Sequence, residues 1–293
     1  MVKVYIKMRN EEEIIKKVKE CLIKAASTFS DDKKDAYRNA IEKETVSTAK
    51  WILETTLENA LVAEQNKSPL CDDSGIPHLY LEVGQNKNVN AKLIKLIHQG
   101  IAEGLRALPG RPMAIKGNDW QRLDQSGSLN EDPGALLPAP ILFMPTMEDV
   151  IRLHILMDGG GPEIRGKTFR VFHQHKVSVV VDEIINWAVE SASKLGCTPV
   201  TLAIGIGRSH FEATSLMMEA MVFGKYTIQN DIEKEITDKV NQTNIGPLGI
   251  GGKTTALGTF IKIGPQRASG VRIVCLRPCC CIEPRKANIN LDI

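Results

Sequence analysis

The chain has 293 residues, 43% of them hydrophobic and 25% charged, which is typical of a soluble globular protein with one large domain or two ordinary ones. Lysine and arginine exceed aspartate and glutamate by only two, so the overall charge does not indicate binding to nucleic acid or to an anionic membrane. No apolar run approaches the roughly 18 residues that a membrane-spanning helix requires.

The first third of the chain is predicted to be mainly helical. Apolar residues recur at helical spacing over 14–25, and a second helical stretch is predicted from about 32 to 66. The segment PLCDDSG then forms a turn, and IPHLYLEV alternates between apolar and polar residues as a strand does. Residues 90–107 again show the pattern of an amphipathic helix.

Strands and helices are mixed in the remainder. Residues 108–140, rich in Gly, Pro, Asp and Asn, are too many for an ordinary connection, so this segment is predicted to be functional or mobile. Strands are predicted at ILFM, DVIRLHILM, TPVTLAIGIG, TFIKI and VRIVCL, and helices lie between several of them. The order of elements predicts the α+β class: a single domain over 1–293, with a helical part at about 10–67 and a mixed part at about 68–290.

The glycine-rich segment GPLGIGGKTT invites comparison with a phosphate-binding loop. Pro247 stands where that loop requires its first glycine, and Gly246 lies one residue too early. Nucleotide binding is therefore a minor alternative, and Lys253→Ala would remove any ATP binding that depends on this loop. The bare N–H groups here and in AIGIG could instead bind a small anion such as a carboxylate.

The seven cysteines form no regular disulfide framework, and the N-terminus lacks a secretory signal, so we expect a cytoplasmic protein with free thiols. Cys21 falls on an apolar helix face and is expected to be a buried hydrophobe. Cys71, Cys197 and the group at 275–281 lie beside predicted turns. Three thiolates from three loops suit a soft metal or an iron–sulfur cluster, and three protein ligands leave one iron open. Ordinary buried cysteines are the alternative.

Five motifs, taken together, resemble the iron–sulfur hydro-lyases, namely the class I fumarases and the L-tartrate dehydratases. They are PLCDDSGIPHLYLEVG, GRP at 110–112, the glycine run at 159–161, GCTPVTLAIGIG and NIGPLGIGGKTTALGTFIKI. The resemblance covers residues 12 to 287 and is to the α subunit of the two-subunit forms.

What the resemblance implies is specific. The fold would be that of the class I fumarase N-terminal domain, and the cofactor a 4Fe-4S cluster on three cysteines with one open iron. The reaction would be the reversible hydration of a small dicarboxylate such as fumarate or tartrate. A separate β subunit would complete the enzyme, as a heterodimer or an α2β2 assembly.

The resemblance also implies which cysteines bind the cluster. Cys71 matches the first ligand and Cys197 the second. The third ligand stays open between two residues, because counting from the upstream Ala-Ser pair reaches Cys279 whereas counting back from the downstream basic pair reaches Cys281. Neither count reaches Cys280.

By the same resemblance, Asp72, Asp73 and Arg111 contact the substrate, and Asp73 is a catalytic residue. An arginine suits a dicarboxylate because its guanidinium binds a carboxylate through two parallel hydrogen bonds. The alternatives are a solvated loop arginine and a turn-forming aspartate. A carboxylate at Asp72 stands where the family has an amide. Two further departures, the replacement of a histidine by Gln266 or Arg267 and the altered region after the glycine run, favour the alternative of a non-catalytic or altered-specificity paralogue that keeps the fold as a metal-binding subunit.

Overall fold

The computed structural model describes residues 2–108 and 110–291, and side chains from residue 10 onward within those ranges. The chain forms two compact units, each considered by itself below. The prediction of a single domain over 1–293 stays a prediction. The first unit comprises Met1–Thr28, Val62–Gly159 and Arg285–Ile293, and the second comprises Phe29–Leu61 and Gly160–Pro284.

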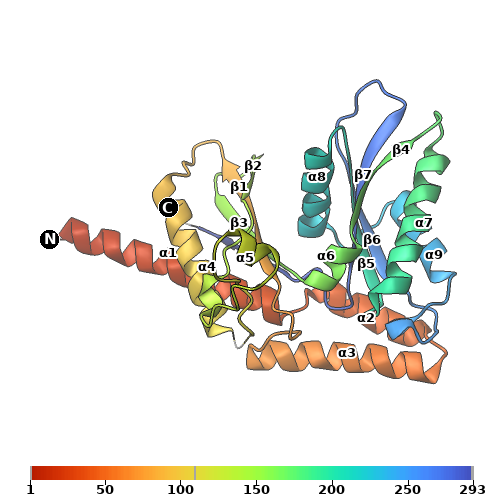
Figure 1. Ribbon diagram of the computed structural model, residues 1–293, viewed down its shortest axis with the longest axis horizontal. Helices are drawn as coiled ribbons and strands as arrows, with labels where there is room; N and C mark the ends of the chain where they lie inside the picture. Colours follow the sequence, from red (N-terminus) through yellow and green to blue (C-terminus); the bar gives the residue numbers. More distant parts are fainter. Residues whose placement is uncertain (1, 109, 292–293) are drawn as a thin grey trace. The chain divides into compact units, whose positions relative to one another are not determined.

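The first unit is built on a mixed sheet with the strand order β2-β1-β3-β8. β1 is parallel to β2 and antiparallel to β3, which is antiparallel to β8. Helices α1 and α4 pack on one face, where the apolar residues of the alternating pattern meet them (Figure 1). The elements are α1 (Val2–Ser27), β1 (Ile76–Gly84), α4 (Ala91–Ala107), β2 (Leu142–Thr146), β3 (Ile151–Asp158) and β8 (Lys286–Asn290).

The opposite face of this sheet carries polar side chains. His78, Tyr80 and Glu82 alternate with core residues along β1. On β3, His154 pairs with Tyr80 in the strand register, and its Nε2 lies 2.7 Å from a carboxylate oxygen of Glu82. Asp158 ends β3 on the same face as His78, because His78 pairs with the residue two positions before Asp158.

The second unit is a three-layer arrangement around the sheet β4-β7-β5-β6. Helices α7 and α9 lie on one face and α8 on the other (Figure 1). All residues of the central strand β5 are buried, as a strand covered on both faces requires. The elements are β4 (Lys167–Phe172), α7 (Val177–Leu195), β5 (Val200–Gly207), α8 (His210–Phe223), α9 (Asp231–Asn241), β6 (Ala256–Ile263) and β7 (Val271–Cys279).

The mixed α/β architecture confirms the predicted α+β class. The prediction of one helical stretch over 32–66 was wrong in one respect, because α2 (Asp31–Lys43) and α3 (Ser47–Asn66) are separate helices. Between them Glu44 Oε1 accepts hydrogen bonds from the N–H groups of Thr45 and Val46, which offers the backbone an alternative to helix. Among the helices within the described ranges, none is long and apolar enough to cross a membrane.

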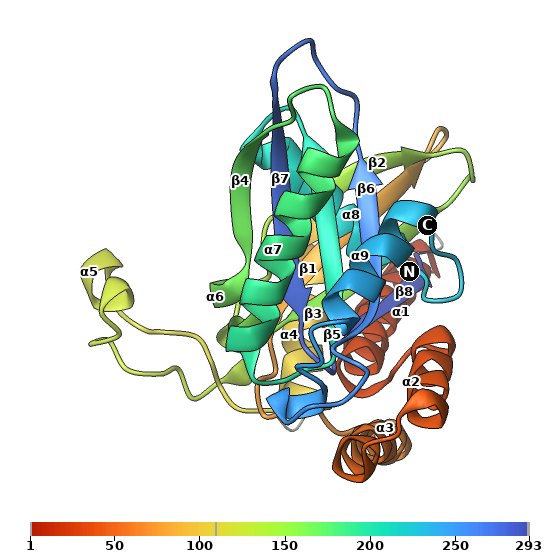
Figure 2. The same ribbon diagram turned by 90° about the vertical axis from the view of Figure 1, so that its right-hand side faces the viewer.

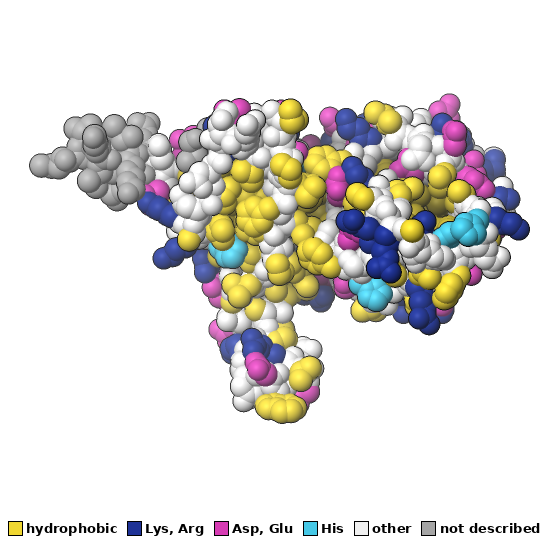
Figure 3. Space-filling view, turned by 90° about the horizontal axis from the view of Figure 1, so that it is seen from above, with side chains coloured by type: hydrophobic (Ala, Val, Ile, Leu, Met, Phe, Trp, Pro, Cys, Tyr) yellow, Lys and Arg dark blue, Asp and Glu magenta, His cyan; other side chains and the backbone are white. Residues whose placement is uncertain are grey.

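The segment 110–140 is largely irregular, as its composition predicts. It contains the short helix α5 (Asp119–Leu123), which begins with a capping box at Asn118, a 3-10 turn at Pro133–Ala135 and an isolated β-bridge between Ile115 and Leu129. The part around α5 stands out from the rest of the first unit (Figures 2 and 3), and its Trp120 and Leu123 side chains are exposed. Whether this segment is functional stays a prediction.

Candidate functional site

Cys71 lies in the turn between α3 and β1, in the first unit. Its Sγ donates a hydrogen bond to Asp72 Oδ1 at 3.3 Å, and Arg111 Nη1 lies 3.8 Å from Asp72 Oδ2. Burial raises the pKa of the Cys71 thiol, the Asp73 N–H lowers it, and the carboxylate of Asp72 raises it again. The thiol, the Asp73 N–H and the Arg111 guanidinium all lower the pKa of Asp72. Three of the predicted site residues therefore contact one another here.

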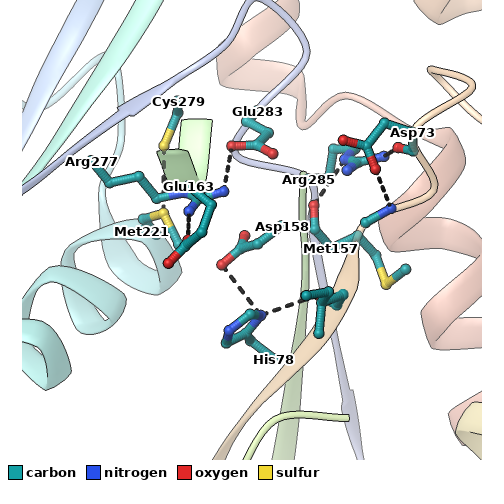
Figure 4. A network of polar contacts seen from close by, with 12 residues as sticks. Asp73, His78, Met157, Asp158, Glu163, Met221, Arg277, Cys279, Glu283 and Arg285 are labelled. Carbon is teal, nitrogen blue, oxygen red and sulfur yellow. Dashed lines mark hydrogen bonds and ion pairs between the residues drawn. The ribbon is translucent and has the colours of Figure 1, made fainter. Parts of the chain in front are cut away.

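Asp73 stabilises this turn through its side chain and its backbone carbonyl. Its Oδ1 accepts a hydrogen bond from the N–H of Gly75 at 3.1 Å, which is the bond of a turn-forming aspartate. Its backbone carbonyl accepts another from Arg285 Nη1 at 2.7 Å, and Arg285 Nε donates to the carbonyl of Met157 at 2.8 Å (Figure 4). The turn-forming role of Asp73 is thus present, and its catalytic role stays a prediction.

Cys197 and Cys281 lie side by side in the second unit. The N–H of Cys281 donates to the carbonyl of Cys197 at 2.8 Å, and the Tyr37 hydroxyl donates to the carbonyl of Cys281 at 2.7 Å. Cys197 follows Gly196, whose positive φ of 80° ends α7. Cys197 is exposed and Cys281 half-buried. The backbone of Cys281 is therefore held on both sides, next to a second accessible cysteine.

Cys279 has different surroundings. It is the last residue of β7, pairs with Thr201 of β5, and is 0% exposed. Its Sγ contacts the sulfur of Met221 on α8 at 3.4 Å (Figure 4). The neighbouring thiol of Cys280, which has the larger effect, and burial both raise the pKa of Cys281. Of the two cysteines left open by the sequence, only Cys281 lies beside Cys197, while Cys279 is part of the core.

A buried ammonium group lies beside these cysteines. Lys33 is 1% exposed, its Nζ donates to the carbonyl of Glu283 at 2.6 Å, and it lies 4.3 Å from the ring centre of Phe29. Burial lowers the pKa of Lys33 to about 8, although the thiols of the Cys279–Cys281 triplet act in the opposite direction. A positive charge beside several thiols suits a group whose ligands are thiolates.

Lys33 was not among the predicted site residues, although the sequence contains a pattern that indicates it. Lys33, Tyr37 and Ala40 are spaced by four and three residues in α2, and all three are buried. That spacing places a lysine on an apolar helix face, where a charge needs a specific partner.

Within the described residues, no group of three or more His, Cys, Asp or Glu side chains is arranged to hold a metal ion.

The glycine-rich loop after α9 is bonded to the segment that carries Cys197. Thr198 Oγ1 donates to the carbonyl of Gly246 at 2.6 Å, and the N–H of Leu248 donates to the carbonyl of Thr198 at 3.1 Å. The N–H of Lys253 donates to Glu44 Oε2 at 2.7 Å. The Lys253 N–H is therefore already bonded to the Glu44 carboxylate, whereas in a phosphate-binding loop such a donor would bind the phosphate.

Glu44→Gln is expected to destabilise this loop by roughly 2 kcal/mol, because the N–H groups of Thr45, Val46 and Lys253 lose a charged acceptor. Burial raises the pKa of Glu44, but these bonds outweigh it and leave the pKa lowered. The stabilisation by Glu44 is therefore fully present above the pKa that its carboxyl has in the unfolded chain. It is lost as the pH falls through the lower pKa of the folded protein. Urea unfolding at neutral and acid pH measures it. The exposed Glu42→Gln is the control, and an equal acid sensitivity in both variants would contradict the assignment.

Thiol alkylation should follow burial. Burial raises the pKa of Cys21 to about 12, and Cys279 is enclosed between β7 and α8. We expect iodoacetamide to modify Cys197 in the folded, cluster-free protein and to leave Cys21 and Cys279 unmodified until denaturant is added. Peptide mass mapping over time measures the order, and labelling of Cys21 as fast as Cys197 would contradict the structure.

The chain is thus an α+β protein with loop cysteines in both units: one lies beside acidic residues and a loop arginine in the first unit, and two lie beside a buried lysine in the second. Comparison with known proteins then identifies the family. The family described as Fumarate hydratase (Fumerase) matches residues 15–290, and the chain belongs to that family. The resemblance noted from the motifs is thereby confirmed.

The relatives are similar over most of the chain. A putative L(+)-tartrate dehydratase subunit alpha of Methanocaldococcus jannaschii is 28% identical, over 94% of this chain and 97% of its own length. An L(+)-tartrate dehydratase subunit alpha of Escherichia coli is 22% identical, over 97% of this chain and 94% of its own. A putative class I fumarate hydratase of Geobacillus stearothermophilus is 25% identical, but only 50% of its length is matched. The family and these names support a hydro-lyase function.

Proposed function

We propose that the chain is the α subunit of a 4Fe-4S-dependent hydro-lyase that adds water to, or removes it from, a small dicarboxylate of the fumarate/malate or tartrate type. The observation that carries the proposal is the backbone hydrogen bond from the Cys281 N–H to the Cys197 carbonyl, which places two free cysteines next to each other in a chain of the fumarate hydratase family. The subunit alpha names of the relatives favour a separate β subunit, in a heterodimer or an α2β2 assembly. We expect the enzyme to be cytoplasmic.

The proposed cluster ligands are Cys71, Cys197 and Cys281. Each of the three lies in a loop and is at least partly accessible. Cys279 is the less suitable third ligand, because its sulfur is enclosed against Met221. Soft thiolate donors fit an iron–sulfur cluster, and such a cluster, when bound by three protein ligands, supplies an open iron that acts as a Lewis acid toward a substrate oxygen.

The remaining residues have defined tasks in this proposal. The ammonium of Lys33 offsets the negative charge of the thiolates beside it. Arg111, whose guanidinium is exposed, binds a substrate carboxylate through paired hydrogen bonds. Asp72 beside it moderates that positive charge, and Asp73 contacts the substrate during catalysis.

One observation favours the alternative of a non-catalytic, metal-binding paralogue. Where the family has a histidine, the Gln266 amide donates to the carbonyls of Ile206 and Gly264. The imidazole of His173 is bonded to the same segment, through Nε2 and the carbonyl of Ser269 at 2.7 Å. These contacts are structural, so any proton transfer assigned to the family histidine needs another group here.

Anaerobic purification, with and without the β subunit co-expressed, tests the proposal. We expect a brown protein with iron–sulfur absorbance, and hydratase or dehydratase activity only in the co-purified complex. Absorbance without turnover of malate or tartrate would favour the non-catalytic alternative. A complex lacking both absorbance and activity would contradict the proposed function.

A further inference from the structure

A histidine–aspartate pair lies on the polar face of the sheet in the first unit. His78 Nδ1 is 3.4 Å from Asp158 Oδ2 and 3.1 Å from the carbonyl of Ile76 (Figure 4). Both neighbours are acceptors, so in the neutral ring these contacts favour the tautomer with the proton on Nδ1 and the lone pair on Nε2. The carboxylate thus fixes the tautomer of the imidazole.

The second carboxylate oxygen of Asp158 and the second ring nitrogen of His78 are available to bind a ligand. Asp158 is 4% exposed, yet its Oδ1 has no hydrogen-bond partner among the described residues. A quarter of the His78 side chain is exposed, and within the same ranges no partner is found for its Nε2. A buried carboxylate oxygen without a donor is costly unless a ligand or water completes it.

Other imidazoles are engaged differently. His154 Nε2 bonds to Glu82 at 2.7 Å. His173 uses both ring nitrogens, because Nδ1 accepts from the N–H of His175 at 3.0 Å while Nε2 bonds to the carbonyl of Ser269. His154 is thus already bonded to a carboxylate through Nε2, and both ring nitrogens of His173 have partners.

The pair adjoins the turn that carries Cys71, Asp72 and Asp73. That turn runs directly into β1, two residues before His78. At Gly75, whose φ is +79°, an added Cβ would lie 3.0 Å from the backbone of Asp158. The turn and the end of β3 are therefore packed against each other within the first unit, where Asp158 adjoins Gly75, two residues after Asp73.

We propose that His78 is the proton acceptor of the hydro-lyase reaction and that Asp158 positions it; this inference rests on the proposed function. His78 Nε2 takes the proton from the carbon next to a substrate carboxylate, and the C–H electron pair becomes the second bond of the alkene. The C–O bond breaks with its electron pair, and the departing hydroxide takes a proton from solvent to leave as water. The imidazolium then releases its proton to solvent, while Asp158 stabilises its charge.

Kinetics of the anaerobically loaded α/β complex test the assignment. His78→Gln is expected to lower kcat about 100-fold with little change in KM or in iron–sulfur absorbance. His98→Gln, on an exposed position of α4 in the same unit, is the matched control and should keep the wild-type rate. Asp158→Asn should slow the wild type but not the His78→Gln variant, because it acts through His78. A His78→Gln complex with wild-type kcat, or an equal effect of Asp158→Asn in both backgrounds, would overturn the proposal.

Nitrogen NMR of the histidine rings in the full chain gives a readout independent of turnover. We expect His78 in the Nδ1–H tautomer, and loss of that preference in Asp158→Asn, whose side chain keeps the same shape. A dominant Nε2–H tautomer in the wild type would overturn the proposal, and this test also serves if His78→Gln misfolds. The expected tautomer in a wild-type complex that lacks both cluster and activity would instead locate the failure in the proposed function.

Discussion

Serine in place of Cys281 is expected to abolish cluster binding, whereas serine in place of Cys279 is expected to preserve it. Cys281 is fixed beside Cys197 by a backbone hydrogen bond and by the Tyr37 hydroxyl. The Cys279 sulfur is enclosed against Met221 in the core. A hydroxyl is a poor ligand for cluster iron, so the loss of one of three thiolates removes the cluster.

Iron and sulfide content and visible absorbance after anaerobic reconstitution measure the difference. Cys280→Ser is the matched control from the same triplet and should bind the cluster. Cys279→Ser should cost about 1–3 kcal/mol of unfolding free energy, because it buries a hydroxyl against the thioether of Met221. Circular dichroism separates this from cluster loss. A folded Cys279→Ser variant without a cluster, together with a loaded Cys281→Ser variant, would reverse the assignment.

Removing the Glu283 carboxylate is expected to destabilise the second unit by about 3–5 kcal/mol, because it leaves Arg277 as a buried charge. Arg277 and Glu283 are 2% and 1% exposed, and Arg277 Nη2 lies 3.2 Å from Glu283 Oε2 (Figure 4). The carbonyl of Glu283 also accepts the ammonium hydrogen bond of Lys33. Because Glu283 lies two residues after Cys281, loss of its ion pair is also expected to loosen the segment that carries Cys281.

Glu163→Ala is the matched control, because Glu163 pairs with the same arginine from an exposed position. It should cost less than the Glu283 substitution, because water around the exposed Glu163 carboxylate screens its attraction to Arg277. Urea unfolding of the cluster-free protein compares Glu283→Ala with this control. Equal losses for the two variants would show that burial of the ion pair does not govern its contribution.

Much of the fold follows from local pattern. The apolar spacing over 90–107 predicts a helix, and the structure begins that helix after Asn90, whose side chain accepts the N–H of Leu93. The alternation in IPHLYLEV correctly predicts β1, and the continuous apolar run in TLAIGIG predicts a strand that is buried on both faces. In each case the residues that decide the element lie within a few positions of it.

The features that local pattern did not reveal depend on distant partners. The break between α2 and α3 depends on Glu44, whose carboxylate also accepts a hydrogen bond from the N–H of Lys253. The short strands β4 and β8 form only because longer strands pair with them. The third cysteine stayed open because counting along the chain cannot tell a strand end from a loop. Pairing of Cys279 with Thr201 and of Cys281 with Cys197 distinguishes their surroundings. The ligand role itself stays a prediction.

Mössbauer spectroscopy of the anaerobically isolated α/β complex, before and after addition of the dicarboxylate that it turns over, tests the proposed function most directly. The proposal predicts the spectrum of a 4Fe-4S cluster in which one iron changes its environment when the substrate is added. A complex that turns over the dicarboxylate without bound iron, or with a cluster spectrum that the substrate leaves unchanged, would contradict it.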